Sequence, residues 1–347
     1  MVKQKRQARV WLTVLMISLS LTGCNVARQP YPYQVTDLLM DTVVSIKAYG
    51  ENSPHALEQA LAFIKKVDAL VSRYEPGSDI YRINTMAGKK PVPVDKLTFN
   101  LIKEAVAYGD ITGGALDVTI GPLVDLWRIP DAADRHLPSR GEIESRLQLV
   151  DYRQVILDSN KTTVFLPREG ASLDLGSVAK GFAARGAVTI LRREGVQSAL
   201  VTLGGHVYAL GNKPGRKTWQ VGIQDPFKQD HIMATLNVTD LAIDTAGGYY
   251  RYKEINGEKL VHIIDPATGM PAGALASVTV ITGDSFKADA LATAVYVLGE
   301  EKGLALLQKE RAAGIIVTRD GRILTTSNLK EKVPDFKLIG VETGGQK

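Results

Sequence analysis

The stretch that decides the fold is Asp174-Leu175-Gly176-Ser177-Val178-Ala179-Lys180-Gly181, where small residues carry the chain from an extended segment into a helix expected over residues 177–193. The first turn of a helix presents unpaired backbone N–H groups and the positive end of its dipole, and Lys180 adds a full charge one turn in. This arrangement suits a pyrophosphate anion. The alternative is that Asp174 and Ser177 simply cap the helix.

Strands and helices are expected on both sides of this stretch. Before it, the pattern predicts a strand over residues 38–49 and helices over 55–71 and 98–108. Around and after it, strands are expected over 154–157, 163–166 and 199–203, followed by β segments through residue 280. Two helices, over 288–298 and near 302–310, and a hairpin around Asp320-Gly321 complete the chain.

Strand runs interleaved with a few helices indicate an α+β, or mixed α/β, fold in which mixed sheets are flanked by helices. The polar segment over residues 130–150 contains an acidic, arginine-rich helix candidate. We expect this segment to be the seam between two closely associated lobes.

The N-terminus has the pattern of an export signal. Residues 1–9 carry basic side chains and no acid, and a short apolar run over residues 10–21 follows, too short to span a bilayer. It ends in Leu21-Thr22-Gly23-Cys24, which resembles the bacterial lipobox. Cys24 is the sole cysteine of the chain and cannot form an intrachain disulfide, so lipidation gives it a purpose. We expect a signal peptide over 1–23, a tether over 24–34 and a globular part over 35–342.

The basic net charge of the chain does not predict a nucleic-acid partner. The 347 residues contain 42 Lys and Arg against 37 Asp and Glu. Lys3, Lys5, Arg6 and Arg9 all lie in the predicted signal, which has no acid, so the rest of the chain is almost neutral.

The common nucleotide, zinc and hydrolase motifs are absent from the sequence. No two glycines stand two residues apart, which excludes the G-x-G-x-x-G fingerprint. Gly176 and Gly181 have a spacing close to that of a Walker loop, but Phe182 follows where that loop requires lysine. The chain also lacks H-E-x-x-H and G-x-S-x-G motifs. Any nucleotide must therefore be held by other means.

Several other segments place isolated polar residues among small ones. The segment from Gly113 to Trp127 either is a glycine turn leading into a strand or lets a ligand lie against bare backbone, with Asp117 accepting hydrogen bonds. In the segment over residues 262–269, His262 alternates with apolar neighbours near a carboxylate. It is either a core histidine or a general base titrating near neutral pH.

The last such segment places Asp289 and Thr293 four residues apart on an otherwise apolar, small-residue helix. Their oxygens then share one face, and a buried carboxylate needs compensation. A hard cation with oxygen ligands would supply it, Mg²⁺ before Ca²⁺ if phosphates share the coordination. Alternatively, Asp289 lies at the helix N-terminus and Thr293 bonds back to the backbone.

Taken together, these segments resemble the FAD:protein FMN transferase (ApbE, flavin transferase) family. The match covers most of the chain after the signal, in this order: Met40-Asp41-Thr42, residues 72–84, 113–127, 174–181, 203–205, 262–269 and 288–299. The resemblance implies an ApbE-like fold and Mg²⁺-dependent transfer of the FMN half of FAD to a Thr or Ser hydroxyl of a target protein, with release of AMP.

The resemblance also implies roles for individual residues. His262 stands where the family has its proposed base. The residues implied around Mg²⁺ are Ser177, Asp289 and Thr293. The residues implied around FAD are Met40, Ala115, Leu116, Asp117, Asp174, Lys180 and Ile264. The chain departs from many relatives at Asp41, where they have Met-Gly-Thr, and at His206, where they have Gly-Gly-Asn.

Two other functions remain open at this point: an FAD pyrophosphatase that uses water as the acceptor, and a lipoprotein that binds FAD without chemistry. If the transferase reading holds, the expected partners are FAD and flavoprotein subunits of respiratory redox complexes with an accessible Thr or Ser. The lipid on Cys24 would hold the enzyme at the extracytoplasmic side of a bacterial membrane, the periplasmic face where two membranes exist.

Overall fold

The computed structural model describes residues 31–129, 136–228, 230–249, 251–255 and 257–339. The predicted signal peptide and Cys24 lie outside these residues, as does most of the predicted tether. None of the helices in the described ranges is long and apolar enough to cross a membrane.

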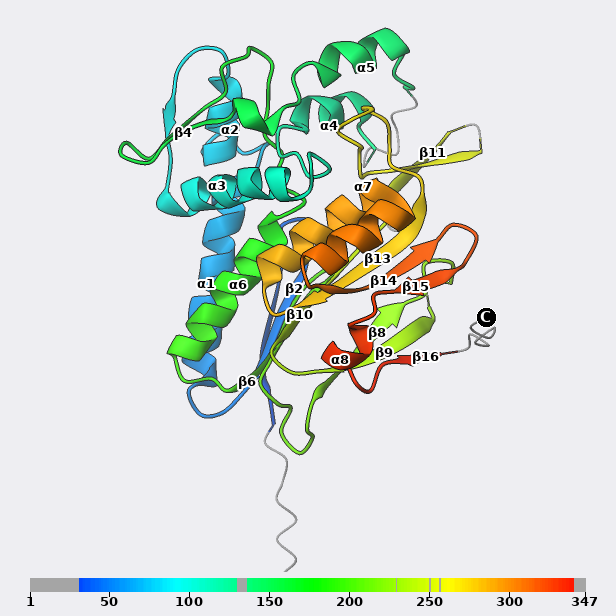
Figure 1. Cartoon of the computed structure of the whole chain (residues 1–347). Coiled ribbons are helices and arrows are strands. Elements are labelled where there is room, and N and C mark those ends of the chain that lie inside the picture. Colours follow the sequence, from blue (N-terminus) through cyan, green and yellow to red (C-terminus); the bar gives the residue numbers. More distant parts are fainter. Residues whose placement is uncertain (1–30, 130–135, 229, 250, 256, 340–347) are drawn as a thin grey trace, which may run out of the picture.

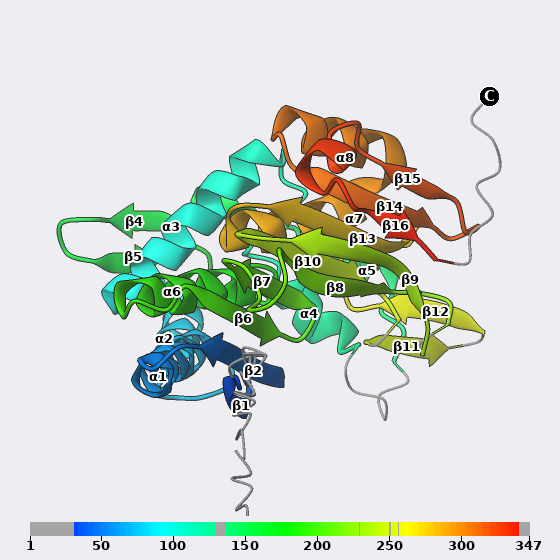
Figure 2. The same cartoon turned by 90° about the horizontal axis from the view of Figure 1, so that it is seen from below.

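The centre of the fold is an eight-stranded antiparallel sheet. Figure 2 shows the strands in the spatial order β1-β2-β6-β7-β10-β13-β14-β15. The strand bounds are β1 Tyr33–Leu39, β2 Thr42–Tyr49, β6 Ser198–Leu203, β7 His206–Leu210, β10 Leu241–Gly247, β13 Leu275–Thr282, β14 Ala313–Thr318 and β15 Ile323–Thr325.

Long helices cover one face of this sheet (Figure 1). They are α1 Ser53–Val71, α6 Ala179–Arg193 and α7 Ser285–Lys309, with α2 Asp79–Thr85 and α3 Lys96–Ile111 beside them. The other face packs on a small sheet of β8 Trp219–Gln224, β9 Ile232–Val238 and β16 Lys337–Leu338, with α8 Leu329–Lys332.

Smaller elements surround these layers. A separate sheet is formed by β3 Val92–Pro93, β4 Ile156–Asp158 and β5 Thr163–Phe165, and a hairpin by β11 Tyr252–Ile255 and β12 Glu258–Val261. The remaining helices are α4 Gly121–Trp127, α5 Arg140–Leu147 and the short 3₁₀ helix η1 Tyr152–Gln154.

Side chains alternate between the two faces of the central sheet, so each strand contributes to the core under the helices and to the core against the small sheet. Along β10, Ala242 packs in the helix-side core, whereas its neighbour Ile243 packs against the small sheet. Asp244, the next residue, therefore points to the helix side, together with Ala242.

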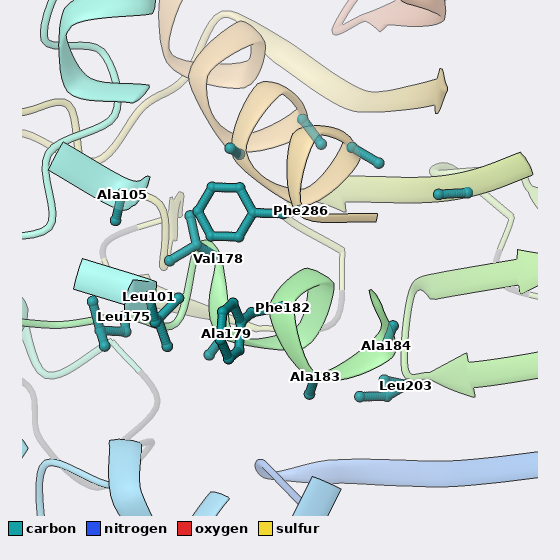
Figure 3. Packing of buried hydrophobic residues seen from close by; sticks show 14 of the residues in the cluster. Leu101, Ala105, Leu175, Val178, Ala179, Phe182, Ala183, Ala184, Leu203 and Phe286 are labelled. Carbon is teal, nitrogen blue, oxygen red and sulfur yellow. The ribbon is translucent and has the colours of Figure 1, made fainter. Parts of the chain in front are cut away.

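The helix-side core depends on a close approach of α6 and α7. Ala183 and Ala184 of α6 are buried in this core, as are Val178, Phe182 and Phe286 (Figure 3). A Cβ atom at Gly181 would lie 2.4 Å from the Ser285 carbonyl oxygen and 2.7 Å from Cβ of Asp289. Glycine is therefore required at position 181 by contact rather than by backbone conformation.

The mixed α/β fold class is confirmed, and most of the expected elements are present. The strand expected over residues 38–49 is wrong: it is the hairpin of β1 and β2, turning at Met40 and Asp41, whose φ angles are 54° and 55°. Positive φ is uncommon for a residue such as Met40, and no Asn-Gly or Gly signal marks the turn.

Three further boundaries differ from expectation. The predicted tether extends to Gln34, whereas β1 begins at Tyr33. The glycines at 113 and 114 lead towards helix α4 rather than into a strand. The two helices expected over 288–298 and near 302–310 are confirmed, because the span α7 is divided by a kink at the non-helical Gly299, but the first of them begins earlier than expected, at Ser285. The seam predicted over residues 130–150 lies partly outside the described residues, and the two-lobe division stays a prediction.

Replacing Gly181 with Ala should lower the free energy of unfolding by about 1–3 kcal/mol, because the added methyl group overpacks the α6–α7 contact. Denaturant unfolding measures the change. Gly141→Ala in α5 is the matched control, since a Cβ there meets nothing within 4 Å. We expect Gly141→Ala to leave stability unchanged or slightly higher. If Gly181→Ala were as stable as Gly141→Ala, the close contact between α6 and α7 at Gly181 would be contradicted.

Candidate active site

A cavity of about 890 Å³ opens where the first turns of α6 and α7 meet the central sheet. This volume lies in the range of small-molecule and cofactor sites, roughly 300–1,000 Å³. Every residue predicted for the site from the sequence, apart from Cys24, lines this cavity. These residues are Met40, Ala115, Leu116, Asp117, Asp174, Ser177, Lys180, His262, Ile264, Asp289 and Thr293.

The segment that leads into α6 does not cap the helix with side chains. The helix begins at Ala179 after Val178, and no side-chain hydrogen bond caps it. Asp174 instead accepts from the backbone N–H of Gly176 at 2.9 Å and from the guanidinium of Arg73 at 2.9 Å. The capping alternative is therefore wrong. At the start of α6, the N–H of Ala179 donates to the carbonyl of Leu175 and that of Gly181 donates to Asp289, so the helix offers the cavity chiefly the positive end of its dipole.

Arg73 is a cavity residue that the sequence did not single out. Its side chain is only 10% exposed, and it bridges Asp174 and Asp125, with a further hydrogen bond to the carbonyl of Gly121. Arg73 thus joins the loop after α1, the start of α4 and the segment before α6. The segment Ser72-Arg73-Tyr74 resembles the family, and this is the one sequence feature that could have pointed to Arg73. Its partners lie 48 or more residues away, so no local pattern reveals them.

Lys180 and Asp289 form a partly buried ion pair at the junction of α6 and α7. The Lys180 Nζ lies 3.4 Å from Oδ1 of Asp289, and Oδ2 of the same carboxylate accepts from the backbone N–H of Gly181 at 2.7 Å. Burial raises the pKa of Asp289, and the charge of Lys180 opposes this. Burial alone would lower the pKa of Lys180, but Asp289 and Asp244 outweigh it and raise that pKa. Lys180 therefore stays an ammonium.

The oxygen set of Ser177, Asp289 and Thr293 fits Mg²⁺ in its chemistry. All three line the cavity, and Asp289 is 1% exposed, so its carboxylate lacks the hydration that would otherwise stabilise its charge. Within the described residues, no group of three or more His, Cys, Asp or Glu side chains is arranged to hold a metal ion. Mg²⁺ commonly binds one or two carboxylates and completes its coordination with water and substrate phosphates, as this set would require.

His262 is held as a neutral imidazole. Its Nδ1 lies 3.0 Å from the backbone carbonyl of Arg251, and because a carbonyl only accepts, Nδ1 carries the proton and Nε2 holds the lone pair. Burial lowers the pKa of His262 to about 4, against a weaker opposing effect of this hydrogen bond. The expectation that it titrates near neutral pH is therefore wrong for the ligand-free protein.

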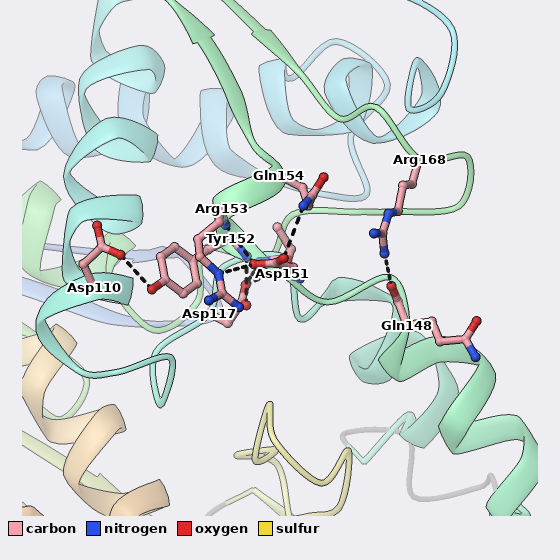
Figure 4. Close-up of polar contacts among 9 residues, drawn as sticks. Asp110, Asp117, Gln148, Asp151, Tyr152, Arg153, Gln154 and Arg168 are labelled. Carbon is pink, nitrogen blue, oxygen red and sulfur yellow. Dashed lines mark hydrogen bonds and ion pairs between the residues drawn. The ribbon is translucent and has the colours of Figure 1, made fainter.

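Asp117 belongs to a hydrogen-bond network beneath the cavity wall (Figure 4). Its Oδ1 accepts from the backbone and hydroxyl of Thr119 at 2.8 and 2.6 Å, and its Oδ2 accepts from the backbone N–H of Tyr152 at 3.0 Å. Tyr152 in turn donates to Asp110. The lone-pair positions left on Asp117 for a ligand are therefore on Oδ2.

The β1–β2 turn brings Met40 and Asp41 to the cavity. The backbone N–H of Met40 donates to Asp68 at 3.1 Å, and Arg251 donates to the carbonyl of Asp41 at 2.7 Å. Arg251 thus contacts both this turn and His262. Arg251 contacts the backbone carbonyl of Asp41 and not its side chain.

His206 forms a buried pair with Asp244. Nδ1 of His206 lies 3.0 Å from Oδ1 of Asp244, and the two side chains are 0% and 5% exposed. The other ring nitrogen, Nε2, is buried without a partner. An unsatisfied buried polar group of this kind costs about 1–3 kcal/mol. Asp244 lines the cavity but is not among the site residues predicted from the sequence.

The fold and site together define a protein that holds an anionic, cofactor-sized ligand where a helix N-terminus, an ammonium and a buried carboxylate meet. Comparison with known proteins agrees. The model of the ApbE family matches residues 40–316, and the chain belongs to this family.

Relatives and solved structures cover most of the chain. An FAD:protein FMN transferase of Klebsiella pneumoniae (strain 342) is 36% identical over 305 residues, which cover 85% of this chain and 92% of the relative. An FAD:protein FMN transferase of Treponema pallidum (strain Nichols) is 32% identical, and the match covers 92% of this chain and 94% of the relative. The ApbE protein of Thermotoga maritima has a TM-score of 0.81 at 32% identity, and the flavin transferase ApbE of Vibrio cholerae 0.77 at 28%. Each match covers 87% of this chain, together with 99% of the Thermotoga maritima chain and 100% of the Vibrio cholerae chain.

The imidazole of His262 should stay neutral in the ligand-free protein until the pH falls to about 4, since burial disfavours its charged form. Its folded pKa lies below the ordinary value of 6.5, so the stability it contributes is complete above pH 6.5 and is lost as the pH falls towards 4. NMR titration of the ring protons, assigned with His262→Gln, measures the midpoint. A midpoint at or above 6.5 would contradict the buried, neutral assignment.

Proposed function

We propose that the protein is an FAD:protein FMN transferase, which moves the FMN half of FAD to a Thr or Ser hydroxyl of a target protein and releases AMP. The observation that carries the proposal is that one cavity holds both parts this reaction needs. The Lys180–Asp289 junction lies at the N-terminus of α6, and the neutral imidazole of His262 lies in the same cavity. Membership of the ApbE family supports it.

In this reaction, the acceptor oxygen forms a bond to the phosphorus of the FMN half as the bond from that phosphorus to the bridging oxygen breaks. The bridging oxygen leaves with AMP. Negative charge increases on the pyrophosphate oxygens, and the Lys180 ammonium and the positive end of the α6 dipole would stabilise it. Ser177, Asp289 and Thr293 would hold Mg²⁺, which supplies further charge neutralisation when bound.

The proton of the acceptor hydroxyl has to leave during the attack. His262 offers a lone pair on Nε2 and is fixed in this tautomer by Arg251. Its low pKa in the empty site makes it a weak base. A bound pyrophosphate would raise that pKa, because the negative charge of the ligand favours the imidazolium. Substrate binding would thereby strengthen the base where it is needed.

The transferase is favoured over the pyrophosphatase and over simple FAD binding. Simple binding gives no role to an oriented, neutral imidazole in the cavity wall. The relatives that cover most of the chain carry the transferase name. Proposed targets are extracytoplasmic flavoproteins, such as subunits of respiratory redox complexes, that expose the acceptor residue.

Substituting His262 with Ala should reduce FMN transfer about 10²- to 10⁴-fold, the usual contribution of a general base. FAD affinity should change little, since the imidazole acts on the acceptor. The assay incubates the protein with FAD, Mg²⁺ and a flavoprotein fragment bearing an accessible Thr, then detects flavin fluorescence on a denaturing gel.

The same assay separates the competing functions. Wild-type protein that releases FMN and AMP without labelling the fragment would contradict the transferase and favour the hydrolase. Binding of FAD with neither product would favour the non-catalytic lipoprotein. Normal transfer by His262→Ala would remove His262 from its proposed role.

We further propose that lipid on Cys24 anchors the enzyme at the extracytoplasmic face of the membrane, where its targets expose their acceptor residues. The chain has the signal and lipobox pattern at its N-terminus, and the globular fold begins at β1, nine residues after Cys24. None of the described residues that line the cavity is a cysteine, and the proposed chemistry uses none.

Replacing Cys24 with Ala should therefore move the protein from the membrane fraction without changing its specific activity. Radiolabelled palmitate incorporation and fractionation measure the anchor, and the FMN transfer assay measures the activity. Cys24→Ser serves as a second variant without the lipid acceptor thiol. Palmitate labelling that survives both substitutions would exclude Cys24 as the lipid site.

A further inference from the structure

The active-site cavity lies at one end of the strands of the central sheet. The β1–β2 turn, the β6–β7 turn and the last residues of β10 all line it, and the antiparallel register places these three segments at the same end. The opposite end is the lower one in Figure 1, where α1 begins, whereas α4 and β11 lie at the top. Over its seven residues, β1 separates the two ends by about 20 Å.

The end of the sheet away from the cavity, called the distal end, consists of residues 31–33, 49–53, 192–198, 211–219 and 239–241. The register of the same strands brings these residues together. The chain enters the fold at this end, at the start of β1. None of these residues lines the cavity, so the proposed reaction gives the distal end no role.

The loop between β7 and β8 gives the distal end three cations, Lys213, Arg216 and Lys217. Arg216 and Lys217 are exposed, and none of the three forms an ion pair in the part of the chain that the structure describes. The Lys213 Nζ lies 5.9 Å from the centroid of the Trp219 ring, and that centroid lies 6.0 Å from the centroid of the Tyr49 ring. These contacts hold the loop against the strand ends without neutralising its charge.

The acids of the distal end do not cancel this charge. Asp240 pairs with Arg192 at 2.9 Å, and Glu194 pairs with Arg193 at 2.9 Å. Glu51 is the remaining acid of the distal end, and it faces three cations that have no acidic partner. The distal end therefore carries a net positive charge, although the whole chain after the predicted signal is almost neutral.

Exposed tyrosines accompany these cations where the chain enters the fold. Tyr31 is 89% exposed and Tyr33 is 47% exposed. A tyrosine combines an apolar ring with a polar hydroxyl, which suits the boundary between water and lipid. Lys and Arg side chains near the same boundary are attracted by anionic headgroups. Aromatic rings and unpaired cations on one end of a fold thus match the chemistry of an anionic bilayer surface.

We propose that the distal end lies on an anionic lipid surface, with the cations of the β7–β8 loop on the lipid phosphates and the tyrosines in the headgroup layer. The inference rests on the proposed lipid anchor at Cys24 and adds an orientation to it. Nine residues separate Cys24 from Tyr33 and span at most about 30 Å, so the anchor keeps the distal end near the bilayer. A tether of this length permits many orientations, and the charge of the distal end selects one.

This orientation sets the height at which the enzyme works. With the distal end on the lipid, the cavity lies about 20 Å or more from the bilayer surface, because the length of β1 separates them. Acceptor hydroxyls that a target holds at this height are within reach. Acceptor hydroxyls at the level of the headgroups are not.

Two tryptophans report the orientation. The chain has three, and Trp11 lies in the predicted signal, so the mature protein has Trp219 at the distal end and Trp127 in the cavity wall. The test anchors the mature protein through Cys24 in vesicles with dansyl-labelled headgroups and measures energy transfer from tryptophan to dansyl. Trp127→Phe leaves Trp219 as the donor, and Trp219→Phe leaves Trp127. Adding phosphatidylglycerol to phosphatidylcholine vesicles should raise transfer from Trp219 and leave transfer from Trp127 unchanged.

Surface variants test the role of charge. Each Lys or Arg near an anionic surface favours the docked state about fivefold, so Arg216→Gln with Lys217→Gln should lower the ratio of docked to undocked protein about 25-fold. Transfer from Trp219 then falls to its level in phosphatidylcholine. Lys89→Gln with Lys90→Gln is the matched control, because it removes two exposed cations between α2 and β3, away from the distal end (Figure 1). This control should leave transfer unchanged.

Each outcome decides the inference. Transfer from Trp127 that equals or exceeds transfer from Trp219 overturns it, as does transfer from Trp219 that does not respond to phosphatidylglycerol or to the loss of Arg216 and Lys217. If a tryptophan variant does not fold, total transfer from the wild-type tryptophans in the two charge variants decides in the same way.

Failure of the anchor is a separate result. Absence of palmitate on Cys24 contradicts the proposed anchor, and absence of FMN transfer contradicts the proposed reaction. In either case, coupling the thiol of Cys24 to a maleimide lipid attaches the protein to the same vesicles. The comparison of Trp219 with Trp127 then tests the orientation as before.

Discussion

The contact between the backbone of Gly181 and the carboxylate of Asp289 is the constraint on which the rest of the site depends. The absence of a side chain at Gly181 lets α7 approach α6, and its N–H fixes one oxygen of Asp289 at 2.7 Å. The other oxygen is thereby directed to Lys180. A single close approach between two helices thus brings together a helix N-terminus, an ammonium and a buried carboxylate, all facing one cavity.

The surrounding structure fixes the geometry of this junction from several directions. Arg73 holds Asp174 on one side, and Arg251 holds both the β1–β2 turn and His262 on another. These contacts are made by residues distant in sequence. They explain how segments with no common motif can form one site, and why the cavity needs no glycine-rich nucleotide loop. An anion would be held there by the ammonium of Lys180 and the positive end of the α6 dipole.

Local pattern predicted a large part of this structure. Apolar periodicity predicts α1, small residues around isolated polar ones mark several segments of the cavity wall, and the family resemblance supplies the individual site residues. The sequence could not show what depends on distant contacts. Met40 and Asp41 adopt left-handed turn conformations without the glycine that usually marks such a turn, so the pattern predicts one strand where the structure has two. The pairing of His206 with Asp244 arises from sheet register, and the low pKa of His262 from burial, neither of which is local.

The most direct test of the account is a crystal structure of the protein with ADP and Mn²⁺, in which anomalous scattering locates the metal. The account predicts metal density in contact with the carboxylate of Asp289 and the diphosphate between it and the ammonium of Lys180, at the N-terminus of α6. A diphosphate bound away from this junction, or a metal without contact to Asp289, would contradict it.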